Sequence, residues 1–531
     1  MHQRPEPPRR RSFHANARWA IPLFGALLIG NASTAAGDNI SIVRDLASRL
    51  GPIIGSALAC QNIARPRVQV IIDKFQTVIQ QTASNDAERD DVSRLFDRYV
   101  SDGRGSVMNG KVDCRSADRQ LAEIEQSIGV SSYSPSIADA IAPPTAQAAT
   151  APTQALPPAN VHGVTDREIR FGTVVALSGA AKENGRQLKM GIEAAFGKAN
   201  DSGGVNGRLL KLIAYDDGYD PSRTLAGMKQ LYEKDNVFGF IGNQGTPTAA
   251  IAAPYALEHH ALFYAPHTGA PVVRNDPPDR YVFNYKPSYV EEADQAVRYL
   301  LKIRKIPPRQ IAVFGQNDAY GDSGYNGVTR AYRALGISDN VLKLTYQRNT
   351  VDVDDAINTL RLQKVPIRAV VTVGTYRPVA KFIEKSHDLF PGMIYTSVSA
   401  VGPSSLADEL TMLGPRFTEN VIVTQAVPAV SGYSSIVLDY KNALQKYFPG
   451  EKPDYISLEG FVATNVLIDA LRRCGPQLDT EKLVDIMEAT KNLDLGLGTP
   501  LNFGRGEHQA SHKVWGTMLD QNGVYQSIDL E

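Results

Sequence analysis

Three signals that occur in a fixed order near residue 200 constrain the fold more than any other part of the sequence. An apolar run, Ile169 to Leu177, ends at Ser178-Gly179, and a helix-like segment then closes on the Gly-rich stretch 203–208. A second apolar run, Leu209 to Tyr215, ends at the Asp/Gly/Pro cluster 216–221. Glycine after a helix supplies the left-handed cap, and Asp, Gly and Pro clusters end strands. Strand, helix and strand within about 50 residues form a βαβ unit, so a parallel sheet begins here.

The same alternation continues through the rest of the chain. Amphipathic helical segments separate apolar runs that predict further strands, at Val237–Ile241, Ala261–Ala265, Ile311–Phe314, Ala369–Val373 and Val421–Val423. This alternation predicts an α/β fold with parallel sheets, which bind ligands at the carboxyl ends of their strands. Residues 164–531 are more than one sheet usually organises, so we expect two lobes.

Residues 38–129 have a helical periodicity instead. Apolar side chains recur there at spacings of three and four residues in four stretches, which predicts a small all-α domain. Cys60 and Cys114 could form a disulfide in an oxidising compartment, and Cys474 is left over as a thiol that we expect to be buried. The domain contains no catalytic or metal-ligating pattern, and its role cannot be read from the sequence.

Two further segments divide the chain. Residues 1–36 carry five Arg, an apolar run from Trp19 to Ile29 and the small residues 32–36, which predicts a cleaved export signal. Arg10-Arg11-Ser12-Phe13 resembles a twin-arginine signature, and an ordinary basic leader is the alternative. We therefore expect a periplasmic protein, exported by the general secretory (Sec) or the twin-arginine route. Residues 130–162 are rich in Ala, Pro and Thr, which predicts an extended linker.

Charge and motifs exclude several classes of function. The chain has 56 basic and 56 acidic residues, without the concentrated positive charge that nucleic-acid binding requires. It contains no GxGxxG, Walker A, GxSxG, HExxH or CxxC pattern. The sequence therefore favours a protein that is not an enzyme and that uses no cofactor or metal.

From residue 164 onward, the ordered motifs resemble the leucine/isoleucine/valine-binding protein family, the periplasmic substrate-binding proteins of ATP-driven importers. The matching segments are Phe171 to Gly179, 203–208, 215–221, Ile241-Gly242, Pro266 and Ala319-Tyr320-Gly321. The resemblance implies the type I periplasmic-binding fold, in which two doubly wound lobes joined by three crossovers close on a ligand. Lobe one would contain roughly 164–286 and 427–497, and lobe two roughly 287–426 and 498–531.

The resemblance also implies where ligand would bind in lobe one. Gly245-Thr246-Pro247 opens a helix, and the Thr246 hydroxyl and the helix N-terminus would bind a carboxylate; a plain helix cap is the alternative. The turn His267-Thr268-Gly269 would supply a carbonyl and a hydroxyl to the ligand. The position that holds Thr in the family is Gly269 in this chain, however. A lone His such as His267 is more often a surface or hinge residue. Ser178 would lie at the rim of the cleft.

In lobe two, the resemblance assigns Tyr320 and Tyr376 to cover the ligand, with packing at the lobe edge as the alternative. Amino-acid-binding relatives place an acidic residue near Ser399 to pair with the ligand ammonium. This chain has only Val398 and Ser399 there, and a buried ammonium without a carboxylate is costly, which argues against an α-amino acid ligand. Tyr219 and Gly245 stand where some relatives have a cysteine pair, and we expect that change to affect no chemistry.

Two functions remain in competition. The first is a periplasmic binding protein that captures a small carboxylate-bearing ligand, an amino acid or an amino-group-free organic acid, for the permease subunits of an inner-membrane ABC importer. The second is an envelope sensory or scaffold protein in which the helical domain docks a partner. The linker and the additional domain, which are unusual for a simple transport receptor, keep the second interpretation open.

Overall fold

The computed structural model describes residues 36–60, 63, 65–83, 85–109, 112–127 and 161–531. The predicted export signal and linker lie outside the described residues, except for residue 36 and residues 161–162. The chain divides into two compact units, Met1–Thr150 and Ala151–Glu531. In the described parts of both units, no helix combines the length and apolar character needed to cross a membrane.

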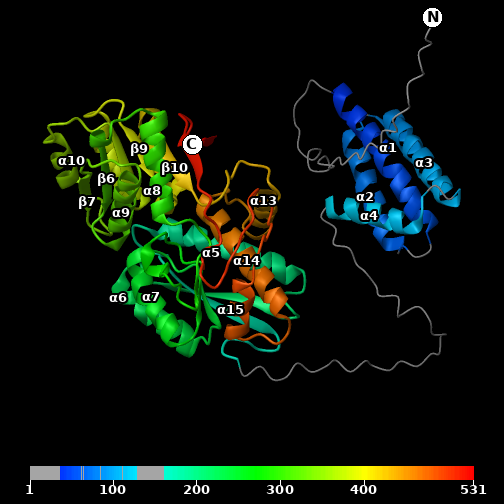
Figure 1. The fold of residues 1–531 in the computed structure, drawn as a ribbon, viewed down its shortest axis with the longest axis horizontal. Helices are drawn as coiled ribbons and strands as arrows, with labels where there is room; N and C mark the ends of the chain where they lie inside the picture. Colours follow the sequence, from blue (N-terminus) through cyan, green and yellow to red (C-terminus); the bar gives the residue numbers. More distant parts are fainter. Residues whose placement is uncertain (1–35, 61–62, 64, 84, 110–111, 128–160) are drawn as a thin grey trace, which may run out of the picture. The chain divides into compact units, whose positions relative to one another are not determined.

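The first unit is a small helical domain, as the periodicity predicted (Figure 1). It consists of α1 (Ala36–Ala59), α2 (Arg65–Thr82), α3 (Asp86–Met108) and α4 (Cys114–Ser127). Helices α1 and α3 approach closely because both carry glycine at the crossing. A Cβ on Gly55 would lie 1.9 Å from the Val100 carbonyl oxygen, and one on Gly103 would lie 2.1 Å from that of Pro52. The core contains Phe75 among other apolar side chains of all four helices.

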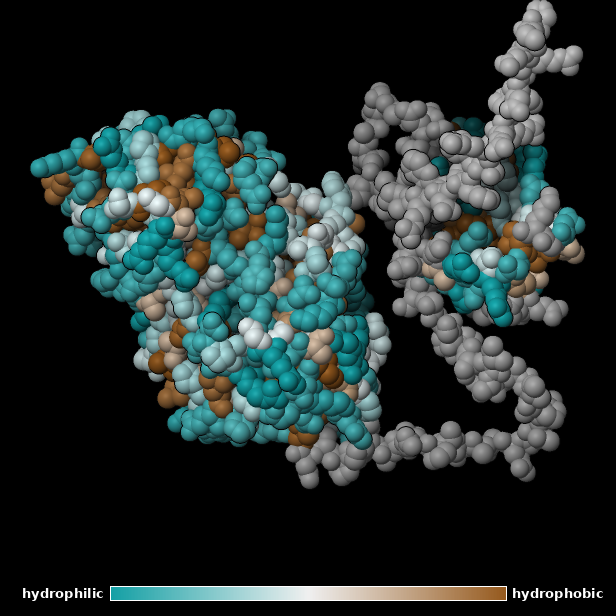
Figure 2. All heavy atoms as spheres, in the orientation of Figure 1, coloured by the Kyte–Doolittle hydropathy of each residue, from teal (hydrophilic) through white to brown (hydrophobic). Residues whose placement is uncertain are grey.

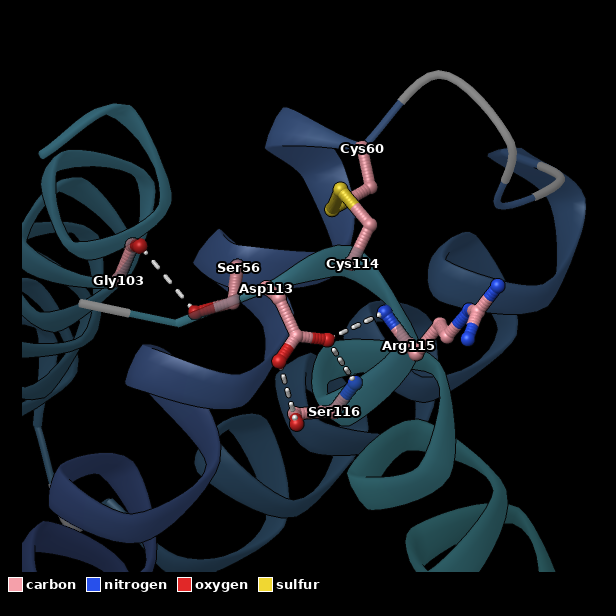
Figure 3. Close-up of a disulfide and its surroundings, with 7 residues drawn as sticks. All are labelled: Ser56, Cys60, Gly103, Asp113, Cys114, Arg115 and Ser116. Atoms are coloured by element: carbon pink, nitrogen blue, oxygen red, sulfur yellow. Dashed lines mark hydrogen bonds between the residues drawn. A yellow bond between two sulfur atoms is a disulfide. The ribbon is translucent and has the colours of Figure 1, made fainter. Parts of the chain in front are cut away.

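A disulfide joins Cys60, directly after α1, to Cys114, the first residue of α4 (Figure 3). Beside it, the Asp113 carboxylate accepts a hydrogen bond from the backbone N–H of Ser116 at 2.9 Å, which satisfies a free donor of the first turn of α4. The disulfide therefore fixes the start of the last helix to the end of the first.

The second unit contains two sheets. The sheet of lobe one has the order β2-β1-β3-β4-β5 and is parallel throughout. Its strands are β1 (Glu168–Val175), β2 (Leu209–Asp216), β3 (Gly239–Ile241), β4 (Leu262–Tyr264) and β5 (Val282–Phe283). Its helices are α5 (Lys182–Asp201), α6 (Pro221–Lys229), η2 (Gln230–Lys234), α7 (Thr246–Glu258), η3 (Pro271–Val273), α13 (Ser435–Tyr447), α14 (Tyr455–Cys474) and α15 (Thr480–Glu488).

The sheet of lobe two has the order β12-β11-β10-β9-β8-β6-β7. Its parallel strands are β6 (Ile311–Gln316), β7 (Leu342–Tyr346), β8 (Ala369–Val373), β9 (Ile394–Ser397) and β10 (Val421–Gln425), and the antiparallel hairpin of β11 (Trp515–Leu519) and β12 (Tyr525–Ile528) extends one edge. Its helices are α8 (Tyr289–Arg298), η4 (Tyr299–Ile303), η5 (Pro308–Gln310), α9 (Ala319–Ala334), α10 (Asp354–Arg361), α11 (Tyr376–His387), η6 (Ser399–Val401), α12 (Pro403–Leu413) and η7 (Pro415–Thr418).

The chain crosses between the lobes three times, after β5, after β10 and before β11. Helices α13 to α15 therefore pack on lobe one although they follow the main strands of lobe two (Figure 1). Helix α14 lies directly on α5, where a Cβ on Gly191 would be 1.9 Å from the Ser457 carbonyl oxygen. This confirms the predicted fold of two doubly wound lobes preceded by a small all-α domain. On the face shown in Figure 2, the exposed hydrophobic residues of this unit lie among hydrophilic ones.

Candidate functional site

A small pocket lies between the lobes, where strands of both sheets end. Its cavity in this structure is about 10 Å³, which is room for about one water molecule. The loops or helices that follow β1, β2, β3, β4 and β5 of lobe one, and β6, β8 and β9 of lobe two, contribute its lining. These residues are Asn184, Tyr219, Gln244, Gly245, Thr246, His267, Tyr289, Tyr320, Thr375 and Ala400.

The two lobes touch each other directly around this pocket. Asn184 Nδ2 of lobe one donates to the Ala400 carbonyl oxygen of lobe two at 3.1 Å. In the opposite direction, Asn349 Nδ2 of lobe two donates to the Tyr219 carbonyl oxygen at 3.4 Å. The structure therefore shows the cleft closed, with the two lobes in contact around the pocket.

The N-terminus of α7 faces this space through Gly245 and Thr246. Gly245 has φ +99°, and its N–H donates to the His267 carbonyl oxygen at 3.3 Å. Thr246 begins the helix, is 1% exposed, and its hydroxyl lies 2.7 Å from that of Thr268. No side chain of the described residues caps this helix, whose first N–H groups lack intrahelical partners and carry the positive end of the dipole. This arrangement is suited to binding an anionic group.

Three buried ionisable side chains meet at the pocket: His267 belongs to its lining, and Lys286 and Glu459 lie outside the lining. His267 Nδ1 is 3.0 Å from Glu459 Oε1, and Lys286 Nζ is 3.1 Å from Glu459 Oε2. Burial raises the pKa of Glu459, but the Lys286 charge and the hydrogen bonds from both partners outweigh burial and hold that pKa at about 2. Burial lowers the pKa of His267. Glu459 is therefore ionised and paired with Lys286, and His267 is neutral.

Ser399 is not among the residues that line the pocket. Its N–H donates to Glu292 Oε2 at 2.6 Å and its hydroxyl to Oε1 at 2.9 Å, while Thr424 Oγ1 also donates to Oε2 at 2.5 Å. The sequence has no acidic residue at Val398 or Ser399, but the fold brings the Glu292 carboxylate to Ser399 from α8. This carboxylate is fully buried, and both of its oxygens already accept hydrogen bonds.

The structure brings some of the sequence-predicted residues together and leaves others aside. Gly245, Thr246, His267 and Tyr320 line the pocket, and Thr268 reaches it only through Thr246. His267 is 2% exposed, so it is not a surface residue. The Tyr320 hydroxyl donates to the Gly374 carbonyl oxygen at 3.3 Å.

The remaining predicted residues do not line the pocket. Ser178 is exposed, and its N–H donates to Asp216 Oδ1 at 3.2 Å. Gly269 packs against Tyr289, whose Cδ1 would be 2.6 Å from a Cβ on that glycine. Tyr376 is buried, and its neighbour Thr375 lines the pocket instead.

Sequence reasoning missed six of the lining residues, of which Tyr219 is the most informative. Its backbone is left-handed, with φ +61°, which is unusual for a bulky side chain. A Cβ on Gly245 would lie 2.2 Å from its ring, so the glycine leaves the space that the tyrosine uses. Tyr219 and Gly245 thus shape the pocket together. The sequence did contain a signal for Tyr219, because it is an aromatic residue inside the Asp/Gly/Pro cluster that ends a strand. The others are Asn184, Gln244, Tyr289, Thr375 and Ala400.

The comparisons with known proteins agree on one family. The family model described as periplasmic binding protein matches residues 168–524. The Leu/Ile/Val-binding protein BraC3 of Rhizobium johnstonii is 23% identical over 338 residues, which cover 62% of this chain and 86% of that protein. The structure of a possible leucine/isoleucine/valine-binding protein from Rhodopirellula baltica is 34% identical, with a TM-score of 0.65, over 69% of this chain and 97% of that one.

A fatty acid ABC transporter substrate-binding protein from Thermomonospora curvata has the same fold. It is 20% identical, with a TM-score of 0.62, over 70% of this chain and 93% of that one. The names of these similar proteins refer to different ligands, so the shared fold does not by itself select one. Helices α1 to α4 lie outside the residues that the family model matches.

Proposed function

Because the chain belongs to the periplasmic binding protein family, we propose that it captures a small carboxylate-bearing molecule between its lobes and delivers it to the inner-membrane permease subunits of an ATP-driven importer. The protein would act in the periplasm, after export by the Sec or the twin-arginine route. It would bind its ligand without transforming it. The ligand would leave when the lobes open by a hinge motion around the three crossovers.

The observation that carries this proposal is the uncapped N-terminus of α7 inside a closed pocket. Thr246 places a hydroxyl and backbone N–H groups there, and the helix dipole favours negative charge. Tyr219 and Tyr320 supply buried aromatic surface on the two sides of the cleft. A molecule with a carboxylate and a small apolar body would satisfy both features.

The names of similar proteins support two ligand classes for testing, branched-chain amino acids and organic acids without an amino group. Thermal unfolding of the full chain should be measured with a panel of both classes. A ligand at a hundred times its Kd stabilises the folded state by about 2.7 kcal/mol, which shifts the melting temperature measurably. We expect at least one carboxylate to stabilise the protein, and calorimetry then gives its affinity. No stabilisation by any carboxylate would contradict the proposal.

A second candidate is a sensory or scaffold protein of the cell envelope, favoured by the separate helical unit. That unit has a core of its own and a disulfide, and it lies outside the family match. Deletion of residues 38–160 with the export signal retained separates the two functions. Under the transport proposal, uptake of the ligand persists in cells with the shortened protein. Loss of function, although the shortened protein binds ligand normally, would favour the envelope role.

A further inference from the structure

The imidazole of His267 has one engaged nitrogen and one unengaged nitrogen. Nδ1 lies 3.0 Å from Glu459 Oε1, whereas Nε2 is buried and has no hydrogen-bond partner among the described residues. The side chain is 2% exposed and lines the pocket. An unpaired polar atom at such a depth costs free energy, which a ligand could recover by pairing with it.

The partners of His267 decide which nitrogen carries the proton. The Glu459 carboxylate also accepts from Lys286 at 3.1 Å, and an ionised carboxylate can only accept hydrogen bonds. The proton must therefore lie on Nδ1. The Lys286 charge already balances Glu459, so a second positive charge on the buried imidazole would have no partner of its own. The neutral ring leaves a bare lone pair on Nε2, which acts as an acceptor.

The backbone of His267 lies beside the N-terminus of α7, which is proposed to bind the carboxylate. Gln244 and His267 form a parallel bridge, and the N–H of Gly245 donates to the His267 carbonyl oxygen at 3.3 Å. His267 is thus next to the residues that precede Thr246. A small ligand that holds its carboxylate at Thr246 would therefore place the atoms next to that carboxylate near His267.

We propose that His267 Nε2 accepts a hydrogen bond from an ammonium or hydroxyl group on the carbon next to the ligand's carboxylate, so that His267 selects 2-amino or 2-hydroxy acids. The inference rests on the proposed function. Glu459 is a positioning residue, because it holds the tautomer without facing the ligand. Near Ser399, where amino-acid-binding relatives place an acid, Glu292 already accepts three hydrogen bonds within the protein.

The test uses four compounds with one carbon skeleton: L-leucine, 2-hydroxy-4-methylpentanoate, 4-methyl-2-oxopentanoate and 4-methylpentanoate. Calorimetry on the full chain should show L-leucine or the hydroxy acid binding about 10- to 100-fold tighter than the oxo and unsubstituted acids, because only the first two donate to Nε2. The difference between L-leucine and the hydroxy acid shows which donor the site prefers. In His267→Phe, we expect the preference over the oxo acid to fall to about twofold or less.

Thr246→Ala is the matched control, because it should weaken all four acids by a similar factor and keep the preference. Equal binding of the four acids by the wild type, or an unchanged preference in His267→Phe, would overturn the inference and leave the proposed function standing. If none of the four acids binds while another carboxylate of the panel does, the inference is also overturned. If no carboxylate binds, the proposed function and the inference fall together.

A measurement without ligand tests the proton position separately. Nitrogen-15 NMR of the histidine side chains at neutral pH should show His267 protonated on Nδ1 and bare on Nε2. The same signal in Glu459→Gln should lose this fixed tautomer, because a neutral amide can also donate. A proton on Nε2 of the wild type, or on both nitrogens, would overturn the inference without affecting the proposed function.

Discussion

Gln316 Nε2 of lobe two donates a hydrogen bond at 3.2 Å to the phenol oxygen of Tyr219, a pocket-lining residue of lobe one. Gln316 is itself held, because its Oε1 accepts from Tyr346 at 3.1 Å and its Nε2 also reaches Asp318 at 2.7 Å. The amide is therefore oriented within lobe two before the lobes meet. Tyr219 can form this contact only when the cleft is closed, so the contact couples closure to the shape of the pocket.

Tyr219→Phe should weaken ligand binding by about fivefold, because a neutral hydrogen bond contributes about 1 kcal/mol. The ring and its packing against Gly245 are retained, so the loss should come from closure alone. Calorimetry with the best carboxylate of the panel measures it. Tyr433→Phe is the control, since Tyr433 is 71% exposed and away from the pocket lining. Equal affinities in the two variants would show that the Tyr219–Gln316 contact does not stabilise the closed cleft.

Gly402 of lobe two lies against Asn184 of lobe one. Its φ is +90°, and a Cβ would lie 2.3 Å from Asn184 Oδ1. Gly402→Ala should therefore obstruct closure and reduce affinity at least tenfold, in addition to destabilising lobe two by about 1–2 kcal/mol through the left-handed backbone. Gly414→Ala tests the backbone effect alone, because its φ is +126° and a Cβ there would meet no atom within 4 Å. Comparable affinity losses in the two variants would contradict a specific role of Gly402 in closure.

The fold could largely be predicted because the residues that end its strands and helices stand at those ends in the sequence. Glycine and Asp/Gly/Pro clusters mark the ends of β1, α5 and β2, and the structure places those elements within a few residues of the predicted bounds. The hairpin of β11 and β12 was not predicted. These strands are short, and β11 pairs with β10, which lies about 90 residues earlier in the chain. No local pattern specifies that pairing.

The contrast between local signals and long-range contacts also separates the site residues that could be predicted from those that were missed. Thr246, His267 and Tyr320 follow strands directly, so their place at the sheet edge is implied by the topology. Asn184 meets Ala400 across 216 residues of sequence, and only when the lobes close. The sequence alone could not indicate that contact, nor that Glu292 would reach Ser399 from a different element.

Thr246→Ala should weaken carboxylate binding by about tenfold and leave the lobes folded. The hydroxyl is one of the groups proposed to hold the carboxylate, and a hydrogen bond to a charged group contributes about 1.5–3 kcal/mol. Thr246→Ser retains the hydroxyl and should bind within about threefold of the wild type. Calorimetry gives the affinities, and Trp515, the one tryptophan after residue 36, reports folding by fluorescence. An alanine variant that is folded and binds normally would remove Thr246 from the site.

Lys286→Met should destabilise the binding unit by about 3–5 kcal/mol, because Glu459 would lose its balancing charge while it remains buried. The double variant Lys286→Met with Glu459→Gln should recover part of this loss, since no charge of the pair is then left unpaired. Urea unfolding followed by Trp515 fluorescence measures the free energies of unfolding. A double variant less stable than the single one would show that the pair stabilises the fold by more than mutual neutralisation.

The disulfide between Cys60 and Cys114 should stabilise the helical unit without affecting ligand binding. It closes a loop with a sequence separation of 54 residues, for which chain entropy in the unfolded state gives a stabilisation of about 4 kcal/mol. The double variant Cys60→Ala with Cys114→Ala should therefore melt the helices of the first unit at a lower temperature, as measured by circular dichroism. Because those helices form a unit with its own core, the unfolding transition seen by Trp515 and the affinity for ligand should not change. A shift of the Trp515 transition would instead show that the two units stabilise each other, so the same pair of measurements also tests their thermodynamic independence.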